Sequence, residues 1–458
     1  MESVPREVLT LILALLPWPD LKRVLQVSRH LQEVGEQPAL WVDFPLILSP
    51  NNLPYCSQLL QLPRLLRLRR VRIQGCKLRN KHVTELLRSL VQEVTFGEGH
   101  DLEKDVELAG LSPSLLATMA TKMRSVSFHS SLLNQLSEQQ ILAIVNKLNH
   151  PTSQTKTLAI FFDNNLSSLP ASTLAWALAS LSHLTLVFQK LNCDKYNCLF
   201  KEIGEGRASL QSLSLSGNDL SRVDPQLLGQ ATVRLVTLNL SDTKLTSLHL
   251  ESLLSSLAQP GTRLRKLDIS HNGGLRGVDE RLVAHLVRLE EVSLKFTKLT
   301  PPQLETLLAS LLTPARRLSC LSLVGTHSLA RVPAPLLASL HYLTSCDLFA
   351  TKLTALQLTA LLSLPPTSHL RHLDLGCCNL SSLSSSLWPS LLASLSSLSL
   401  YQCHLSLPHQ LAILSCLCSL PRQARLESLD LGGNTLGLEG EVLARARGRL
   451  RKLVVNRI

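Results

Sequence analysis

The side chains of this chain that could do chemistry are its cysteines, its histidines and its clustered basic residues. The sequence has 458 residues, with 11 cysteines and 15 histidines. The cysteines are odd in number, lack Cys-x-x-Cys pairs, and include the adjacent Cys377 and Cys378 and the close pair Cys416 and Cys418. A zinc site needs tetrahedral clusters of His and Cys, which no spacing here indicates. We therefore expect reduced, buried thiols without metal or cofactor, in a protein of the cytoplasm, the nucleus or both.

Motifs of catalysis are missing from the sequence. It contains no Gly-rich phosphate loop, no His-Glu-x-x-His, no Gly-x-Ser-x-Gly and no plausible pair of carboxylates. Isolated histidines such as His129, His183 and His372 fall on outward-facing places of predicted strands, where a surface role is the simpler interpretation. We expect a protein that is not an enzyme.

The formal net charge of +12 is concentrated in two stretches. Residues 64–81 carry eight basic residues and no acid, and the tail after Ala444 carries six more. Such patches attract acidic partners, although solvated edges of a scaffold would look the same. Aromatic residues make up 4% of the chain and none lies within the basic stretch. Without a stacking platform, a nucleic-acid partner is disfavoured.

The elements that must position these side chains repeat along the chain. One phrase of the form L-x-x-L-x-L-x-x-N/C/T-x-L recurs, as in "LQSLSLSGNDL" and "LRHLDLGCCNL", and from Leu181 its spacing alternates near 29 and 25 residues. Each phrase predicts a strand and a turn, with its first, fourth and sixth places buried and the places between them on a concave face. We expect the ninth place inside the turn, where it bonds backbone groups. Long units predict a helix, and short units only a turn or an abbreviated helix.

These alternating units resemble the ribonuclease-inhibitor class of leucine-rich repeats. The resemblance covers about residues 181–458 and implies an α/β fold, a curved horseshoe or solenoid. Looser strand phrases upstream extend the predicted solenoid to residues 68–458, with about fifteen strands and a linker or N-terminal cap at 45–67. A solenoid of this kind binds protein partners on its concave face. The substrate-binding candidates there are Arg70, Arg72, Lys295, Phe349, His372 and Tyr401. The two arginines would favour an acidic or phosphorylated target.

Residues 1–44 stand outside the repeat and begin with "VPREVLTLILALLPWPDL" from Val4. A secretory signal would need a basic head and a small-residue cleavage site, and a membrane span would need roughly 20 apolar residues; neither pattern is present. Three short helices are predicted instead. The first is apolar nearly all round, so something must cover more than one of its sides. Either the repeat domain or a partner provides that cover.

This segment resembles an F-box. Matching residues include Pro5, Val8, Ile12, Asp20 and Trp41, whereas Leu31 stands where the family usually has tryptophan. The resemblance implies that the module binds a Skp-type adaptor and, through it, a cullin-RING ubiquitin ligase. The adaptor-binding candidates are Pro5, Val8, Leu9, Ile12, Leu16, Leu21 and Val24.

The sequence thus predicts a substrate-recognition subunit of a Skp-cullin-F-box type ubiquitin ligase, whose repeats bind the substrate protein. The alternative is a non-catalytic repeat scaffold or inhibitor that binds a protein partner without a ligase, with its N-terminal helices capping the solenoid.

Overall fold

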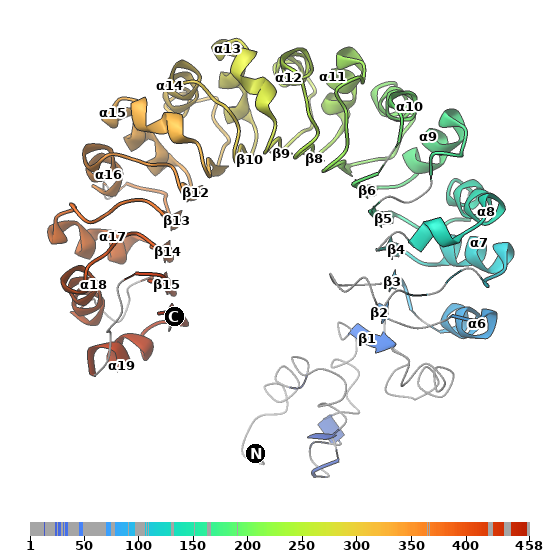
Figure 1. Cartoon of the computed structure of the whole chain (residues 1–458), viewed down its shortest axis with the longest axis horizontal. Helices are drawn as coiled ribbons and strands as arrows, with labels where there is room; N and C mark the ends of the chain where they lie inside the picture. The colour runs from blue at the N-terminus through green and yellow to red at the C-terminus, as the bar shows by residue number, and fades with distance from the viewer. Residues whose placement is uncertain are drawn as a thin grey trace. The chain divides into compact units, whose positions relative to one another are not determined.

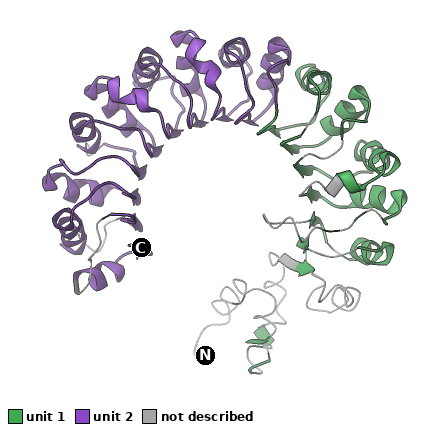
Figure 2. Ribbon diagram, in the orientation of Figure 1, with its two compact units in different colours: residues 1–218 green, residues 219–458 purple. Residues whose placement is uncertain are grey.

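The computed structural model describes residues 13, 23–24, 26–28, 31, 33–34, 45–48, 70–74, 78–89, 91–96, 106, 108, 110–129, 132–150, 152–162, 166–189, 191–363, 365, 367–419, 425–434 and 441–455. These residues form two compact units, 1–218 and 219–458, coloured separately in Figure 2. In each unit parallel strands follow one another in chain order, and helices cover one face of the strand layer (Figure 1). The α/β solenoid predicted from the repeat is confirmed.

The first unit contains seven strands and five α-helices among the described residues. Its strands are β1 (Pro45–Leu48), β2 (Arg70–Ile73), β3 (Glu93–Phe96), β4 (Ser125–Phe128), β5 (Thr157–Phe161), β6 (His183–Val187) and β7 (Ser212–Ser214). Its helices are α6 (Asn80–Arg88), α7 (Pro113–Lys122), α8 (Glu138–Leu148), α9 (Ala171–Ala179) and α10 (Cys193–Gly204), with a 3-10 segment η4 (Leu132–Gln135).

The second unit repeats the same pattern more regularly. Its strands are β8 (Thr237–Asn239), β9 (Lys266–Asp268), β10 (Glu291–Ser293), β11 (Cys320–Ser322), β12 (Ser345–Asp347), β13 (His372–Asp374), β14 (Ser397–Ser399), β15 (Ser428–Asp430) and β16 (Lys452–Val454). Its α-helices are α11 (Pro225–Arg234), α12 (Ser247–Ser256), α13 (Glu280–Val283), α14 (Pro301–Ser310), α15 (Ala334–Leu337), α16 (Ala355–Leu362), α17 (Trp388–Ser394), α18 (Leu407–Ser419) and α19 (Glu441–Arg447). Its 3-10 segments are η5 (Gly273–Gly277), η6 (Ala284–Arg288), η7 (His327–Arg331), η8 (Ala338–Tyr342) and η9 (Ser385–Leu387).

Leucine fills the core between strands and helices. On β9, Leu267 is buried while its neighbours Lys266 and Asp268 face outward, and Leu264 and Ile269 are buried at the first and sixth places of the same phrase. Stacked repeats bury apolar surface that one repeat alone would expose, at about 25 cal/mol for each Å² removed from water.

The ninth place of the phrase closes the turn after each strand, as the sequence predicts. Asn272 is fully buried, and its amide bonds backbone groups of two neighbouring repeats. The thiols of Cys378 and Cys403 take the same place and donate to the carbonyl oxygens of Leu348 and Leu375. Cys76, a third thiol at this place, lies outside the described residues.

A second set of buried polar groups, which the sequence analysis missed, ties long units to short ones. Gln303, in the first turn of α14, donates to the carbonyl oxygens of Leu275 and Val278 in the preceding short unit, both at 2.7 Å. Gln357 and His249 make equivalent bonds from α16 and α12. In these three cases the long unit supplies donors for the irregular backbone of the short unit before it, which gives the alternation of unit lengths a physical basis.

Fifteen of the sixteen strands among the described residues, β2 to β16, fall within residues 68–458, as the sequence predicts. The remaining strand, β1, lies in the segment 45–67 and pairs with β2. One expectation needs correction. Helix α11 has ten residues although its unit is short. The Asp224 carboxylate caps α11, and no 3-10 segment precedes this helix in its unit. In the next two short units, η5 and η7 occupy the residues between strand and helix, so only the abbreviated helices α13 and α15 form.

Candidate protein-binding surfaces

Most of the N-terminal adaptor candidates lie outside the described residues: Pro5, Val8, Leu9, Ile12, Leu16 and Leu21. Val24 is described and is half-buried in a helical turn. Leu13, Leu31 and Val34 are buried, so the described part of the module has an apolar interior. Val27 is 75% exposed. An apolar side chain therefore remains uncovered on this module.

Leu31 packs well although the related family has tryptophan there. Its side chain is only 2% exposed, and its backbone N–H donates to the Ser28 hydroxyl oxygen at 3.2 Å. The smaller side chain thus occupies a closed site, and the third helical segment keeps its buried anchor.

On the strands, the third and fifth places of each phrase form the candidate binding face. Aspartate or asparagine at the fifth place also holds the following turn. The Asp374 carboxylate accepts from the Gly376 N–H at 2.8 Å, and Asp430 accepts from the Gly432 N–H at 2.7 Å. Such bonds fix the backbone where the strand ends. These carboxylates are therefore partly structural, which the sequence analysis did not foresee.

In the first unit the basic candidates are less available than expected. Arg70 pairs with Glu93 on β3, with 2.8 Å between Arg70 Nε and Glu93 Oε2. Arg72 is half-buried on the same strand. Because β2 and β3 pair in register, with Arg70 opposite Glu93, part of the positive charge is neutralised inside the sheet. Exposed ion pairs of this kind contribute little stability but lower the local potential.

In the second unit the structure places the other four candidates on or just after four different strands, β10, β12, β13 and β14. Lys295 follows β10, and its ammonium lies 3.6 Å from an Asp347 carboxylate oxygen. His372 is exposed on β13. Phe349 and Tyr401 are half-buried, because their rings lie over glycines of the next repeat. A Cβ added to Gly376 would come within 2.5 Å of the Phe349 ring.

A hollow of about 470 Å³ lies on the inner face of this unit over β8 to β12. Lys266 and Glu291 pair across it at 2.6 Å, and Lys295 and Asp347 form its other ionic contact. Of the four candidates, only Lys295 lines this hollow. Its charged lining residues are of both signs, and such a mixture gives an interface specificity for the charge pattern of its partner.

Exposed aromatic rings at the strand exits were missed by the sequence analysis. Phe162 and Phe188 stack in the first unit with ring centroids 5.7 Å apart, and His271 and Phe296 stack in the second at 4.9 Å. All four stand at the eighth place of the phrase and have positive φ. The left-handed backbone turns these side chains toward solvent. Phe296 is 50% exposed, and exposed aromatics are frequent anchors of protein interfaces.

The titratable groups of this region fit binding better than catalysis. Burial raises the pKa values of the Cys346, Cys378 and Cys403 thiols, so they stay protonated and are weak nucleophiles. Burial also raises the pKa of Asp374, and the charges of Asp347 and Asp430 add to this effect. Among the residues that the structure describes, no group of three potential ligands could hold a metal ion, and no helix could cross a membrane.

Comparison with known proteins supports both parts of this description. A family model described as F-box-like matches residues 1–44, and a Leucine Rich Repeat model matches residues 209–231 and 369–391. No curated protein matches the chain. The chain therefore joins an F-box-like domain to a solenoid of leucine-rich repeats, the domain composition of F-box proteins with leucine-rich repeats.

Proposed function

We propose that this protein is a substrate-recognition subunit of a Skp-cullin-F-box type ubiquitin ligase. The observation that supports this function is the match of residues 1–44 to an F-box-like domain ahead of a protein-binding solenoid. The module would bind a Skp-type adaptor, and the repeats would hold a protein for ubiquitination by other subunits. The protein would act in the cytoplasm or nucleus without catalytic residues of its own.

The described surfaces support the proposed role of a receptor that binds a protein substrate, folded or extended. The inner hollow, the exposed Phe296 and the neighbouring Lys295 lie over adjacent repeats of the second unit. They combine an aromatic anchor with charges that fix orientation, as protein interfaces do. Of the candidates, we assign Lys295 and His372 to substrate contact, and Phe349 and Tyr401 to support through packing on the next repeat.

Co-purification with the adaptor tests the first half of the proposal. Ile12→Asp with Leu16→Asp should abolish adaptor and cullin recovery, because buried charges without partners are strongly unfavourable. A matched control, Leu248→Asp with Leu356→Asp, places the same charges on α12 and α16, where the leucines are 64% and 73% exposed. The control should bind the adaptor normally. Equal adaptor recovery by the first variant and the wild type would contradict the assignment.

Removal of residues 1–44 separates the proposal from the scaffold alternative. An adaptor-binding module should be dispensable for folding of the repeats and required for adaptor recovery. A mere cap should be required for solubility and irrelevant to the adaptor. Crosslinking mass spectrometry with the adaptor present and the proteasome inhibited would then identify the bound substrate.

A further inference from the structure

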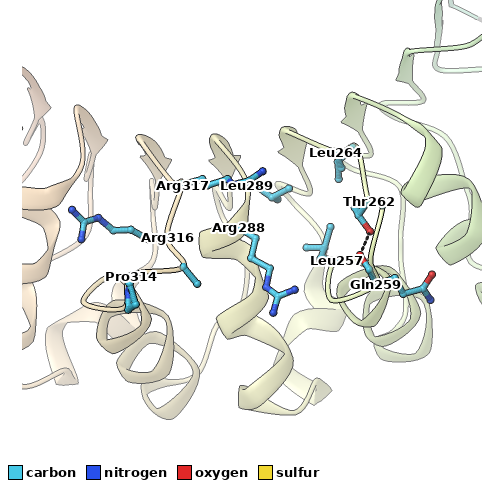
Figure 3. Close-up of a pocket in the computed structure, with 11 residues that line it drawn as sticks. Leu257, Gln259, Thr262, Leu264, Arg288, Leu289, Pro314, Arg316 and Arg317 are labelled. Atoms are coloured by element: carbon cyan, nitrogen blue, oxygen red, sulfur yellow. Dashed lines mark hydrogen bonds between the residues drawn. The ribbon is translucent and has the colours of Figure 1, made fainter.

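A pocket of about 440 Å³ lies in the second unit at the edge where helices end and strands begin, away from the inner face. Its walls are the loop 259–264 after α12 and the loop 314–317 after α14 (Figure 3). Arg288 stands between these loops at the end of η6. Leu257, Leu264 and Leu289 line its apolar side. The volume falls within the range of ligand sites.

The charge of this pocket is positive and uncompensated. Arg288, Arg316 and Arg317 line it together with uncharged residues only. Residues 191–363 are all described, and within them none of these three guanidinium groups forms an ion pair with a carboxylate. Two cations at the start of β9, in one of the same repeats, are paired with carboxylates. Arg265 pairs with Glu290 at 2.5 Å and Lys266 with Glu291 at 2.6 Å.

The repeat itself brings these like charges together. Arg263, Arg288 and Arg317 each immediately precede the first leucine of a phrase, so they take one place in three consecutive repeats. The backbone confirms the stacking, because the N–H groups of Arg263 and Arg317 bond carbonyl oxygens of the preceding repeat at 3.0 and 2.7 Å. Like charges at matching places of neighbouring repeats repel one another, and an anion between them would relieve that repulsion.

Two of the arginines are held in position by weak contacts that leave most donors free. Arg288 donates to the Ala258 carbonyl oxygen at 3.3 Å, and Arg316 donates to that of Leu311 at 3.4 Å. The Arg316 guanidinium also lies 4.3 Å from the centre of the Tyr342 ring, and its side chain points away from Arg288 in Figure 3. A guanidinium has five N–H donors, so each contact uses one and leaves four.

From these observations we propose that the pocket binds a phosphorylated serine or threonine side chain of a protein partner, with Arg288 and Arg317 contacting the phosphate and Arg316 completing its wall. A phosphate monoester carries about −1.5 to −2 charges at neutral pH and three strong acceptor oxygens, which suit several arginine forks. The exposed Pro314 and Ala315 would contact the residues that flank the phosphate, whereas the lining leucines are buried and form the floor of the pocket. The proposal deepens the function proposed above and rests on it for the partner being a protein.

Fluorescence anisotropy of the full-length chain, purified with its adaptor, tests this site. The probe is a labelled peptide library with a central phosphoserine and random flanks, compared with the same library carrying serine. We expect the wild type to bind the phosphorylated library at least tenfold more tightly. Arg288→Gln with Arg316→Gln and Arg317→Gln should remove that preference. The control variant loses the same charge at exposed positions of the same unit, through Arg276→Gln, Arg281→Gln and Lys298→Gln. It should keep the preference for the phosphorylated library.

Each outcome has a defined meaning. Equal binding of the two libraries, or an equal loss in the control variant, would overturn the proposal. The proposal would also be overturned if inorganic phosphate or a single-stranded RNA bound through the same arginines while the phosphorylated library showed no preferential binding. Melting temperatures of both triple variants should stay within a few degrees of the wild type, because none of the replaced side chains is buried. Adaptor recovery, measured on the same samples, should be unchanged; its loss in every sample would instead contradict the ligase function.

Discussion

Replacing Asn272 by alanine should destabilise the second unit far more than an ordinary surface change. The side chain is fully buried in the turn after β9. Its amide nitrogen donates to three carbonyl oxygens and its amide oxygen accepts from two backbone N–H groups. These partners are the carbonyl oxygens of Leu240, Ile269 and Ser270 at 2.7, 3.1 and 3.1 Å, and the N–H groups of Thr243 and Leu245 at 3.3 and 3.0 Å.

The magnitude follows from the groups left without partners. Alanine would leave two buried N–H groups unsatisfied, at about 1–3 kcal/mol each, so the free energy of unfolding should fall by about 4 kcal/mol. A control is available in Asn239, one strand earlier. It is half-buried and its amide oxygen accepts one bond, from the Ser241 N–H at 2.9 Å. Asn239→Ala should lower the free energy of unfolding by about 1 kcal/mol.

Urea denaturation and amide hydrogen exchange measure the two parts of this prediction. A solenoid is stabilised largely by contacts between neighbouring repeats, so the loss should be local as well as global. Exchange at Thr243 and Leu245 should accelerate by about three orders of magnitude in Asn272→Ala, since 1.4 kcal/mol corresponds to a factor of ten. The reasoning is refuted if the two variants lose the same free energy within about 1 kcal/mol, or if exchange at this turn is unchanged.

Three further predictions concern titration and backbone strain. Burial raises the pKa of Asp374 above its ordinary 3.8, so the folded state loses stability as pH rises through the folded pKa. Asp374→Asn should therefore raise the urea midpoint at pH 7 and leave it unchanged near pH 3; equal effects at both pH values would contradict this cause. Burial lowers the pKa of His341 below 6.5, so stability is lost as pH falls through 6.5 toward the folded pKa. His341→Gln should show a smaller loss of melting temperature between pH 7 and pH 5 than the wild type. Ala350 has a φ of 55°, and a left-handed residue with a Cβ is strained by about 1–2 kcal/mol. Ala350→Gly should raise the melting temperature, and a lower value would show that the strain is absent.

The sequence predicts the strand phrase and the ninth-place turn well, because both depend on local pattern and burial. It fails at the eighth place, where Phe188 and Phe296 lie outside the alternation of a regular strand. Their positive φ values break the period of two, so aromatic rings that the pattern leaves unassigned reach the surface. The helix-borne Gln303 was missed for another reason. Its partners are carbonyl groups of the preceding repeat, and a side chain that bonds across repeats has no local signature.

The sequence also predicts the packing of residues 1–44 only in part. Leu31 departs from the related family's tryptophan, which on the sequence alone weakens the third helix. In the structure Leu31 is as buried as Leu13. Leucine in place of tryptophan therefore reduces the side-chain volume in the core without exposing this site to solvent. The adaptor-binding assignment still depends on residues outside the described part of the chain, and mutagenesis decides it.

Electrostatics provides the clearest case in which proximity along the sequence and proximity in the fold differ. Arg70 lies in the most basic stretch of the chain, yet it is paired with Glu93, 23 residues away. Arg288 lies in a stretch of the sequence with no excess of positive charge. In the fold, however, Arg288 and Arg317 of the next repeat line one pocket that has no carboxylate in its lining. In a solenoid the relevant neighbour of a residue is the one at the same place in the next repeat, because neighbouring repeats stack on one another. Charge counted along the sequence therefore points to an arginine that is paired in the fold, whereas charge aligned by place in the repeat points to the pocket proposed above to bind phosphate.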